Sequence, residues 1–337
     1  MKFFAPLLAL CLLAATLPVR VATVGAVPTV GIFGSPPPST LPAGSRLGLP
    51  PGDLREVHEG LDRIFHGDPD AAVTIARELQ KRMPDHPIGY LLETEAAWWK
   101  LYCQACGMRY NLIDAWSRSK LKQDDAYFVL ADRAIQLAET QIARQDSAPM
   151  HVFAGMGYGL KARLHGIRGE HLAVARAGVK GREHFLRALA LDPQLGDALT
   201  GIGLYNYLAD VLSPFAKMLR FFIGVPGGNK KKGIQQLETA MNSAELTAVE
   251  ARFYLARNLR NFDEQYERGA ELMEPLVARY PDNPVFQLLL GDMYAKLNRK
   301  DPAALHFHAA QQIRVSDATC AAHVQNLASV ALADLGR

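Results

Sequence analysis

The sequence predicts an all-α protein, arranged as a right-handed superhelix of stacked antiparallel helix pairs. Apolar residues recur at helical spacing from position 53 to position 335, and no run of alternating apolar and polar residues interrupts them. Prolines divide this region into segments of roughly 12 to 24 residues, a length suited to single helices. One residue pattern also recurs along these segments, which is typical of a helical array.

The overall composition is that of a folded protein and argues against nucleic-acid binding. Of the 337 residues, 49% are hydrophobic and 21% are charged, and the formal net charge at pH 7 is +3. A protein that binds nucleic acid usually presents a strongly basic face to the phosphate backbone. We therefore expect no nucleic-acid partner, and any basic patch has to be local.

Residues 1–26 have the features of an export signal. A lysine at position 2 precedes an apolar run from Phe3 to Leu17, and Val24 and Ala26 are small or apolar, as a signal-peptidase site requires. The run is shorter than the roughly 20 residues that span a bilayer, but apolar residues continue to Phe33 and could retain the segment as an anchor. We expect an exported protein, in the periplasm or associated with a membrane, and leave cleavage open.

Two further regions follow the export signal. Residues 27–52 are rich in Pro, Gly and Ser and lack apolar periodicity, so they are predicted to form a linker. Residues 53–337 are predicted to form a helical repeat domain of about six or seven helix pairs, with longer inserted helices at residues 124–144 and 148–191. The expected helix breaks lie at Pro69, Pro84, Pro87, Pro149, Pro193, Pro214, Pro281, Pro284 and Pro302.

The recurring pattern is clearest near the C-terminus. It consists there of Leu290, Gly291 and Tyr294 followed by Ala303, Phe307 and Ala310; a second copy has Gly181, Phe185 and Ala188 followed by Gly203. In this pattern small residues let two helices approach and aromatic residues fill the remaining space. It resembles the tetratricopeptide repeat, although Gln287 stands where that family often has tryptophan. The resemblance implies stacked helix pairs whose concave face holds a protein or peptide partner.

The segment RFFIGVPGGNKKKG, residues 220–233, admits three interpretations. A phosphate-binding loop would need Gly-x-x-x-x-Gly-Lys with a following Ser or Thr, after a buried strand, and the segment lacks both features. A connector between helices fits the turn residues from Pro226, with Gly228 allowing a positive φ or a close backbone approach and Asn229 capping a helix that begins at Lys230. The third interpretation is a contact with an anionic membrane or an acidic peptide. Its cations are Lys217, Arg220, Lys230, Lys231 and Lys232, which lie beside apolar residues.

Residues 201–240 also resemble a narrower group, the exported bacterial tetratricopeptide proteins, and are distantly similar to the eukaryotic outer-mitochondrial-membrane and tetratricopeptide-repeat-protein-39 family. The shared segment reads GIGLYNYLADVLSPFAKMLRFFIGVPGGNKKKGIQQLETA, with an Asn-Lys pair where that group has Asp-Arg. This resemblance implies a membrane-adjacent adaptor without an established chemistry. Within the segment, Tyr205, Asn206 and Tyr207 are predicted to line a polar groove, because glycines at 201 and 203 would let a partner chain come close.

Cys103 and Cys106 are the strongest candidates for chemistry. Their Cys-x-x-Cys spacing is that of redox motifs, but a helix is predicted to run into Cys103, where such motifs have a preceding strand. Four interpretations stay open: two small buried residues, a local disulfide between them, half of a metal site, or catalysis. Because no second Cys-x-x-Cys pair and no catalytic motif accompany them, we predict no metal site, no cofactor and no enzymatic activity.

The sequence therefore predicts an exported scaffold that grips another protein in its concave face. The leading alternative is a peripheral membrane module that uses residues 217–232, and a third class is a thiol or metal enzyme at the cysteine pair. Trp98, Trp99 and Trp116 are predicted to pack in the core or between helices.

Overall fold

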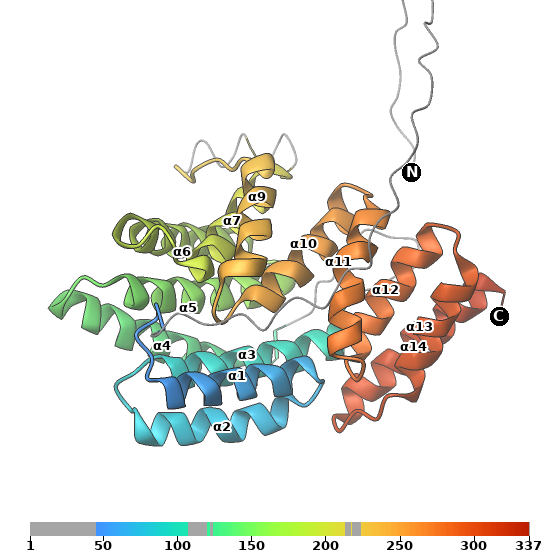
Figure 1. The fold of residues 1–337 in the computed structure, drawn as a ribbon, viewed down its shortest axis with the longest axis horizontal. Coiled ribbons are helices and arrows are strands. Elements are labelled where there is room, and N and C mark those ends of the chain that lie inside the picture. Colours follow the sequence, from blue (N-terminus) through green and yellow to red (C-terminus); the bar gives the residue numbers. More distant parts are fainter. Residues whose placement is uncertain (1–44, 107–119, 122–123, 213–216, 218–223, 337) are drawn as a thin grey trace, which may run out of the picture. The chain divides into compact units, whose positions relative to one another are not determined.

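The structure, a computed structural model, describes residues 45–106, 120–121, 124–212, 217 and 224–336. It consists of α-helices joined by short connections (Figure 1), and these residues include no β-strand. The prediction of an all-α protein is confirmed. Residues 1–44, with the predicted export signal and most of the predicted linker, lie outside the described residues, as do Trp116 and Arg220.

Thirteen helices lie in the described part of the chain. In chain order they are α1 (Pro51–Phe65), α2 (Pro69–Arg82), α3 (Ile88–Ala105), α4 (Asp124–Arg144), α5 (Ala148–Ile167), α6 (His171–Leu191), α7 (Gly196–Asp210), α9 (Lys230–Ser243), α10 (Ala248–Phe262), α11 (Tyr266–Arg279), α12 (Pro284–Lys296), α13 (Lys300–Gln312) and α14 (Ala318–Leu335). Several begin with a proline in the first turn or with a capping side chain, as at Asp68 before α2 and Asn283 before α12.

The helices form two layers of antiparallel neighbours. Each helix packs against the next one in the chain, and alternate helices also touch, α1 with α3, α3 with α5, α5 with α7, and α7 with α10. These alternate helices form an inner layer, and α2, α4, α6 and α9 lie outside it. The predicted stacking of helix pairs is confirmed. The predicted greater length of the helices in residues 124–191 is confirmed, since α4, α5 and α6 have 21, 20 and 21 residues. They are not insertions, because they pack in sequence as members of the array.

The repeat residues pack as their pattern predicts. The ring of Phe307 occupies the space where a Cβ of Gly291 would lie, and the ring of Phe185 does the same at Gly201. A larger residue at either glycine would therefore force two helices apart. The remaining pattern residues Gly181, Ala188, Gly203, Leu290, Ala303 and Ala310 are buried, and Tyr294 is half-buried with its hydroxyl donating to Glu274.

Helix α3 lies at the centre of the array. Its neighbours include α14 from the other end of the chain. The ring of Trp99 lies 4.9 Å from that of Phe253 on α10 and 5.8 Å from that of Phe286 on α12, and Trp98 donates a hydrogen bond of 2.9 Å to the hydroxyl of Tyr254. Both tryptophans are packing residues, as predicted. Along α3 the inner layer is filled by the chain's own side chains. Binding of a partner in a concave face stays a prediction.

The folded body begins before the predicted boundary at residue 53. Leu47 and Leu49 are buried against the core, and Ser45 donates a hydrogen bond of 2.6 Å to Glu245. Arg46 forms an ion pair of 3.1 Å with Asp192. The predicted linker is therefore wrong for residues 45–50, because two leucines without helical periodicity still bury their side chains.

Candidate interaction surface on α7

Helix α7 is held in the inner layer by its own N-terminus. The carboxylate of Asp197 is buried and accepts hydrogen bonds of 2.9 Å from the amides of Glu245, Leu246 and Thr247. A Cβ at Gly196 would lie 2.3 Å from the backbone nitrogen of residue 244. The start of α7 is thereby fixed against the connection between α9 and α10, which sets the direction of the whole helix.

The predicted polar groove on α7 is used inside the protein. Tyr207 is fully buried and donates to the carbonyl of Asn258 at 3.0 Å, and Asn206 donates to Gln236 at 2.7 Å. The prediction that Tyr207 contacts a partner is therefore wrong. Tyr205 is half-buried and donates to the carbonyl of Pro226 at 2.8 Å; its contact with a partner stays a prediction.

The space beside the two glycines of α7 is also filled from within. The ring of Phe185 covers Gly201, and a Cβ at Gly203 would lie 3.1 Å from the carbonyl oxygen of Gly233 on α9. The close approach predicted for a partner chain is therefore made by α6 and α9. The two glycines correctly predict a close contact at this point of α7, but the contact is made within the protein and not with a partner.

One face of α7 is left with exposed apolar side chains. Leu204 and Leu208 lie on α7 at the four-residue spacing that places side chains on one helix face, and Leu212 follows two residues after the helix ends at Asp210. Leu208 is 41% exposed and Leu212 40%, while Leu204 is half-buried against the core. Phe262, at the end of the neighbouring helix α10, is 44% exposed. We call these four residues the α7 stripe.

Sequence reasoning did not identify the α7 stripe. The spacing of the three leucines was visible in the sequence, but a leucine at this spacing is usually a core residue. Helix α7 contacts α5, α6, α9 and α10, and these neighbours leave Leu208 exposed although they half-bury Leu204. Their exposure therefore depends on contacts between helices that are distant in the chain.

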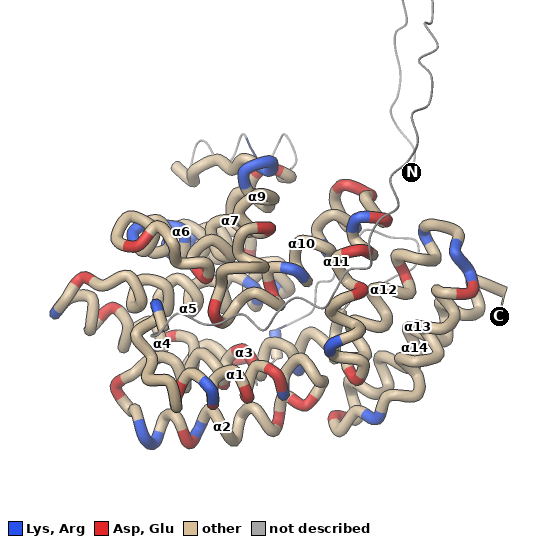
Figure 2. Tube along the Cα trace, in the orientation of Figure 1, with Lys and Arg blue, Asp and Glu red and all other residues tan. Residues whose placement is uncertain are grey.

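Two of the four described cations of the predicted basic segment are paired with acids, and two are exposed. Lys230 forms an ion pair of 2.6 Å with Asp263, and Lys217 one of 3.4 Å with Asp210. Lys231 and Lys232 are exposed at the start of α9, where Figure 2 shows positive charge. None of the described helices combines the length and the apolar character that crossing a membrane requires.

Residues 224–229 form the connector that the turn residues predict, and α9 begins directly after it at Lys230. Asn229 caps α9, its side chain accepting a hydrogen bond of 2.9 Å from the amide of Lys232. A Cβ at Gly228 would lie 2.2 Å from the carbonyl oxygen of Asn206, so the predicted close backbone approach is also present. Gly224 adopts a positive φ of 69°.

Removing the Asn229 cap is expected to cost measurable stability. In Asn229→Ala the amide of Lys232 loses its acceptor, and we expect the free energy of unfolding to fall by about 1 kcal/mol. Urea denaturation followed by circular dichroism measures this change. Asn229→Ser keeps a capping oxygen and serves as the control. Equal stability of the alanine and serine variants would contradict the role of the cap.

A buried polar cluster lies inside the inner layer. Arg163 on α5 donates to both carboxylate oxygens of Glu95 on α3, at 3.0 and 3.1 Å, and lies 2.7 Å from the carboxylate of Glu250 on α10. Both acids are buried, and the guanidinium lies 4.9 Å above the ring of Tyr254. Burial and then the neighbouring Glu95 raise the pKa of Glu250 to about 8, against the opposing effect of Arg163. The cluster therefore joins three helices through one arginine.

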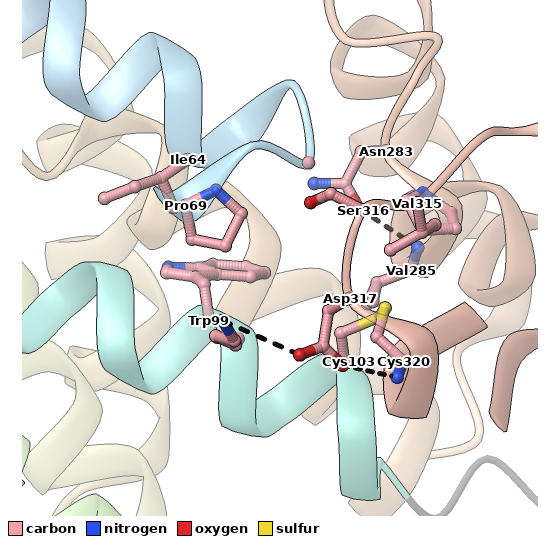
Figure 3. A pocket seen from close by; sticks show the side chains of 13 residues that line it. Ile64, Pro69, Trp99, Cys103, Asn283, Val285, Val315, Ser316, Asp317 and Cys320 are labelled. Atoms are coloured by element: carbon pink, nitrogen blue, oxygen red, sulfur yellow. Dashed lines mark hydrogen bonds and ion pairs between the residues drawn. A yellow bond between two sulfur atoms is a disulfide. The ribbon is translucent and has the colours of Figure 1, made fainter. Parts of the chain in front are cut away.

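The cysteines pair differently from the predicted local bridge. Cys103 on α3 is bonded to Cys320 on α14, with the Cα atoms 5.2 Å apart, while Cys106 is buried outside this bond. The possible Cys103–Cys106 disulfide is therefore wrong, because the first turn of α14 places Cys320 against α3. Figure 3 shows the bond beside a cavity lined by Trp99, among other residues. The cavity, of about 30 Å³, has room for one or two water molecules and is too small for a substrate.

Metal-ligating side chains are scattered over the described residues. No three His, Cys, Asp or Glu side chains are grouped there in a way that could hold a metal ion. His323, which follows Cys320 by one helical turn, bonds through Nε2 to the carbonyl oxygen of Cys106 at 2.6 Å. That ring therefore supports the end of α3.

The chain resembles known proteins in structure but not in sequence. No protein-family model matches the chain, and no curated protein matches it in sequence. YrrB, described as a TPR protein with an unusual peptide-binding site, is similar with 15% identity and a TM-score of 0.35, over 74% of this chain and 97% of that one. TTC0263, a TPR protein of Thermus thermophilus, has 13% identity and a TM-score of 0.31, over 83% and 99%. Yeast Tom70 has 11% identity and a TM-score of 0.28, over 84% and 89%.

Proposed function

We propose that the protein is a helical-repeat scaffold that binds a protein or peptide partner on the inner layer, at the α7 stripe. The observation that carries this proposal is the exposure of Leu208 on α7, of Leu212 just after it, and of Phe262 at the end of the neighbouring helix α10. A contiguous apolar surface on a soluble protein typically marks an interaction site. A row of apolar side chains at four-residue spacing suits the apolar face of a partner helix. This role requires no catalytic group.

Export to the periplasm or a membrane-associated site forms part of this proposal. It rests on the signal-like residues 1–26, and the bond between Cys103 and Cys320 agrees with it, because structural disulfides persist in oxidising compartments. A membrane-surface role is left with Lys231 and Lys232 among the described cations, since Lys217 and Lys230 are paired with acids. We therefore propose a protein surface, and no lipid surface, as the target of the stripe.

The proposal is tested by comparing two leucines of equal exposure. Leu208 lies on the α7 stripe and is 41% exposed, and Leu186 lies on α6 and is 40% exposed. A photo-cross-linking residue at position 208 identifies the partner in an extract of the native source, with position 186 as the control. The purified partner is then titrated against Leu208→Asp and Leu186→Asp by calorimetry.

We expect Leu208→Asp to weaken binding by at least about tenfold, because a carboxylate would be buried in an apolar contact. Leu186→Asp is expected to bind as the wild type does. Equal affinities of both variants for the partner, or cross-links from position 186 alone, would rule out the α7 stripe as the binding surface. Circular dichroism confirms that both variants are folded.

A further inference from the structure

Two histidines on neighbouring helices face each other across the contact between α5 and α6. Nδ1 of His151 lies 2.9 Å from Nδ1 of His184. The other ring nitrogen of each residue faces a carboxylate, with His151 Nε2 at 2.7 Å from Asp146 and His184 Nε2 at 3.5 Å from Glu139. The two side chains are 10% and 15% exposed. The four groups form a continuous chain of carboxylate, imidazole, imidazole and carboxylate.

The contact between the two rings depends on the protons that they hold. It requires one proton, shared as a donor on one ring and an acceptor on the other. His151 Nε2 lies at hydrogen-bond distance from Asp146, whose oxygen only accepts, so this Nε2 carries a proton. A ring that accepts at Nδ1 is neutral, so the contact exists only while one of the two rings is neutral.

The surrounding groups make His184 the neutral ring. Burial, and then the charge on His151, lower the pKa of His184, while Glu139 acts in the opposite direction. Lys180, on the same helix as His184, lowers this pKa further and is itself paired with Glu183.

The remaining charged and titratable neighbours hold the two carboxylates in place. Arg187 on α6 donates to Asp146, and the pKa of that carboxyl is lowered first by Arg187 and then by His151. The hydroxyl of Tyr158 on α5 donates to Glu139 at 2.8 Å, and the tyrosine ring stacks on His184. The two carboxylates that flank the histidine pair are therefore held in place while one ring is still neutral.

We propose that this histidine pair is a pH-sensitive latch between α5 and α6. In mild acid a second proton from solvent binds Nδ1 of His184 and removes the lone pair that accepts the hydrogen bond from His151. Two imidazolium rings then face each other at the distance of a hydrogen bond, where like charges repel. The contact that joins the helices at neutral pH becomes a repulsion, and α5 and α6 are held less tightly.

The direction of the effect on stability follows from proton binding. The folded chain keeps His184 neutral at pH values where an unfolded histidine, with a pKa of 6.5, is already charged. The unfolded chain therefore binds more protons as the pH falls below 6.5, and stability falls with it. The contribution of the neutral His184 ring to stability is fully present above pH 6.5 and is lost as the pH falls.

The test compares the acid-induced loss of melting temperature in three proteins. His184→Asn keeps an acceptor near the position of Nδ1 but does not titrate, and His308→Asn removes an exposed histidine on α13 as the matched control. Between pH 7.5 and pH 5.5, we expect the wild type and His308→Asn to lose about 2–4 °C more than His184→Asn does. An equal loss in all three proteins would overturn the proposal.

A spectroscopic readout separates the latch from a general loss of stability. Nitrogen-15 spectra of the histidine rings in the wild type at pH 7.5 are expected to show coupling between Nδ1 of His151 and Nδ1 of His184 through the shared proton. That coupling is expected to weaken as the pH is lowered and Nδ1 of His184 becomes protonated. Two rings without this coupling at pH 7.5 would exclude the latch whatever the melting data show.

Discussion

Replacing Arg163 by methionine is expected to lower the free energy of unfolding by about 3–5 kcal/mol. The change leaves the carboxylate of Glu95 buried without the guanidinium that donates to it, beside Glu250, whose raised pKa of about 8 keeps it mostly protonated at pH 7. An uncompensated buried charge is one of the most destabilising changes a single substitution can make. Urea denaturation at pH 7 measures the loss.

A triple variant tests whether the loss comes from charge. In the combination of Glu95→Gln, Arg163→Met and Glu250→Gln the cluster is neutral and keeps its volume, so most of the stability lost in Arg163→Met is expected to return. If Arg163→Met stays within about 1 kcal/mol of the wild type, the cluster does not join the three helices energetically. If the triple variant is no more stable than the single one, lost packing outweighs charge.

Loss of the disulfide between Cys103 and Cys320 is expected to lower the free energy of unfolding by about 2–5 kcal/mol. The bond closes a loop across a sequence separation of 217 residues, so its removal releases much conformational freedom in the unfolded chain. Cys103→Ser and Cys320→Ser should therefore be destabilised to a similar extent. Thermal unfolding with and without reductant measures the change.

Cys106 supplies the control for this prediction. It lies three residues from Cys103 but takes no part in the bond, so Cys106→Ser should keep the cross-link. Peptide mapping without reductant should recover a peptide pair joined through Cys103 and Cys320. A pair joined through Cys103 and Cys106, or no joined pair, would contradict the bond.

The local features of the fold could be predicted because they depend on residues close in sequence. Prolines and caps mark helix starts, as at Pro284 and Asn229, and the spacing of Gly291 and Phe307 indicates a pair of helices that meet closely. These signals act over one or two helices. They predict the pairs but not how far the array curves.

The long-range features could not be predicted for the same reason. The pairing of Cys103 with Cys320 depends on α14 returning to α3, and no pattern near either cysteine encodes that return. Tyr207 is predicted to line a groove because the glycines at 201 and 203 would let a partner chain come close, yet its hydroxyl bonds to residues of α10 and the following turn. The α7 stripe was missed because exposure depends on which helices pack around α7.

The central position of α3 changes how the array should respond to heat and to truncation. In an open solenoid each repeat depends only on its neighbours, so the ends fray first and terminal repeats can be removed. Here Trp99 of the third helix packs against α10 and α12, and α14 covers the same helix. The first and last repeats therefore melt together, as in a globular domain, and cutting either end exposes the aromatic centre of the whole chain.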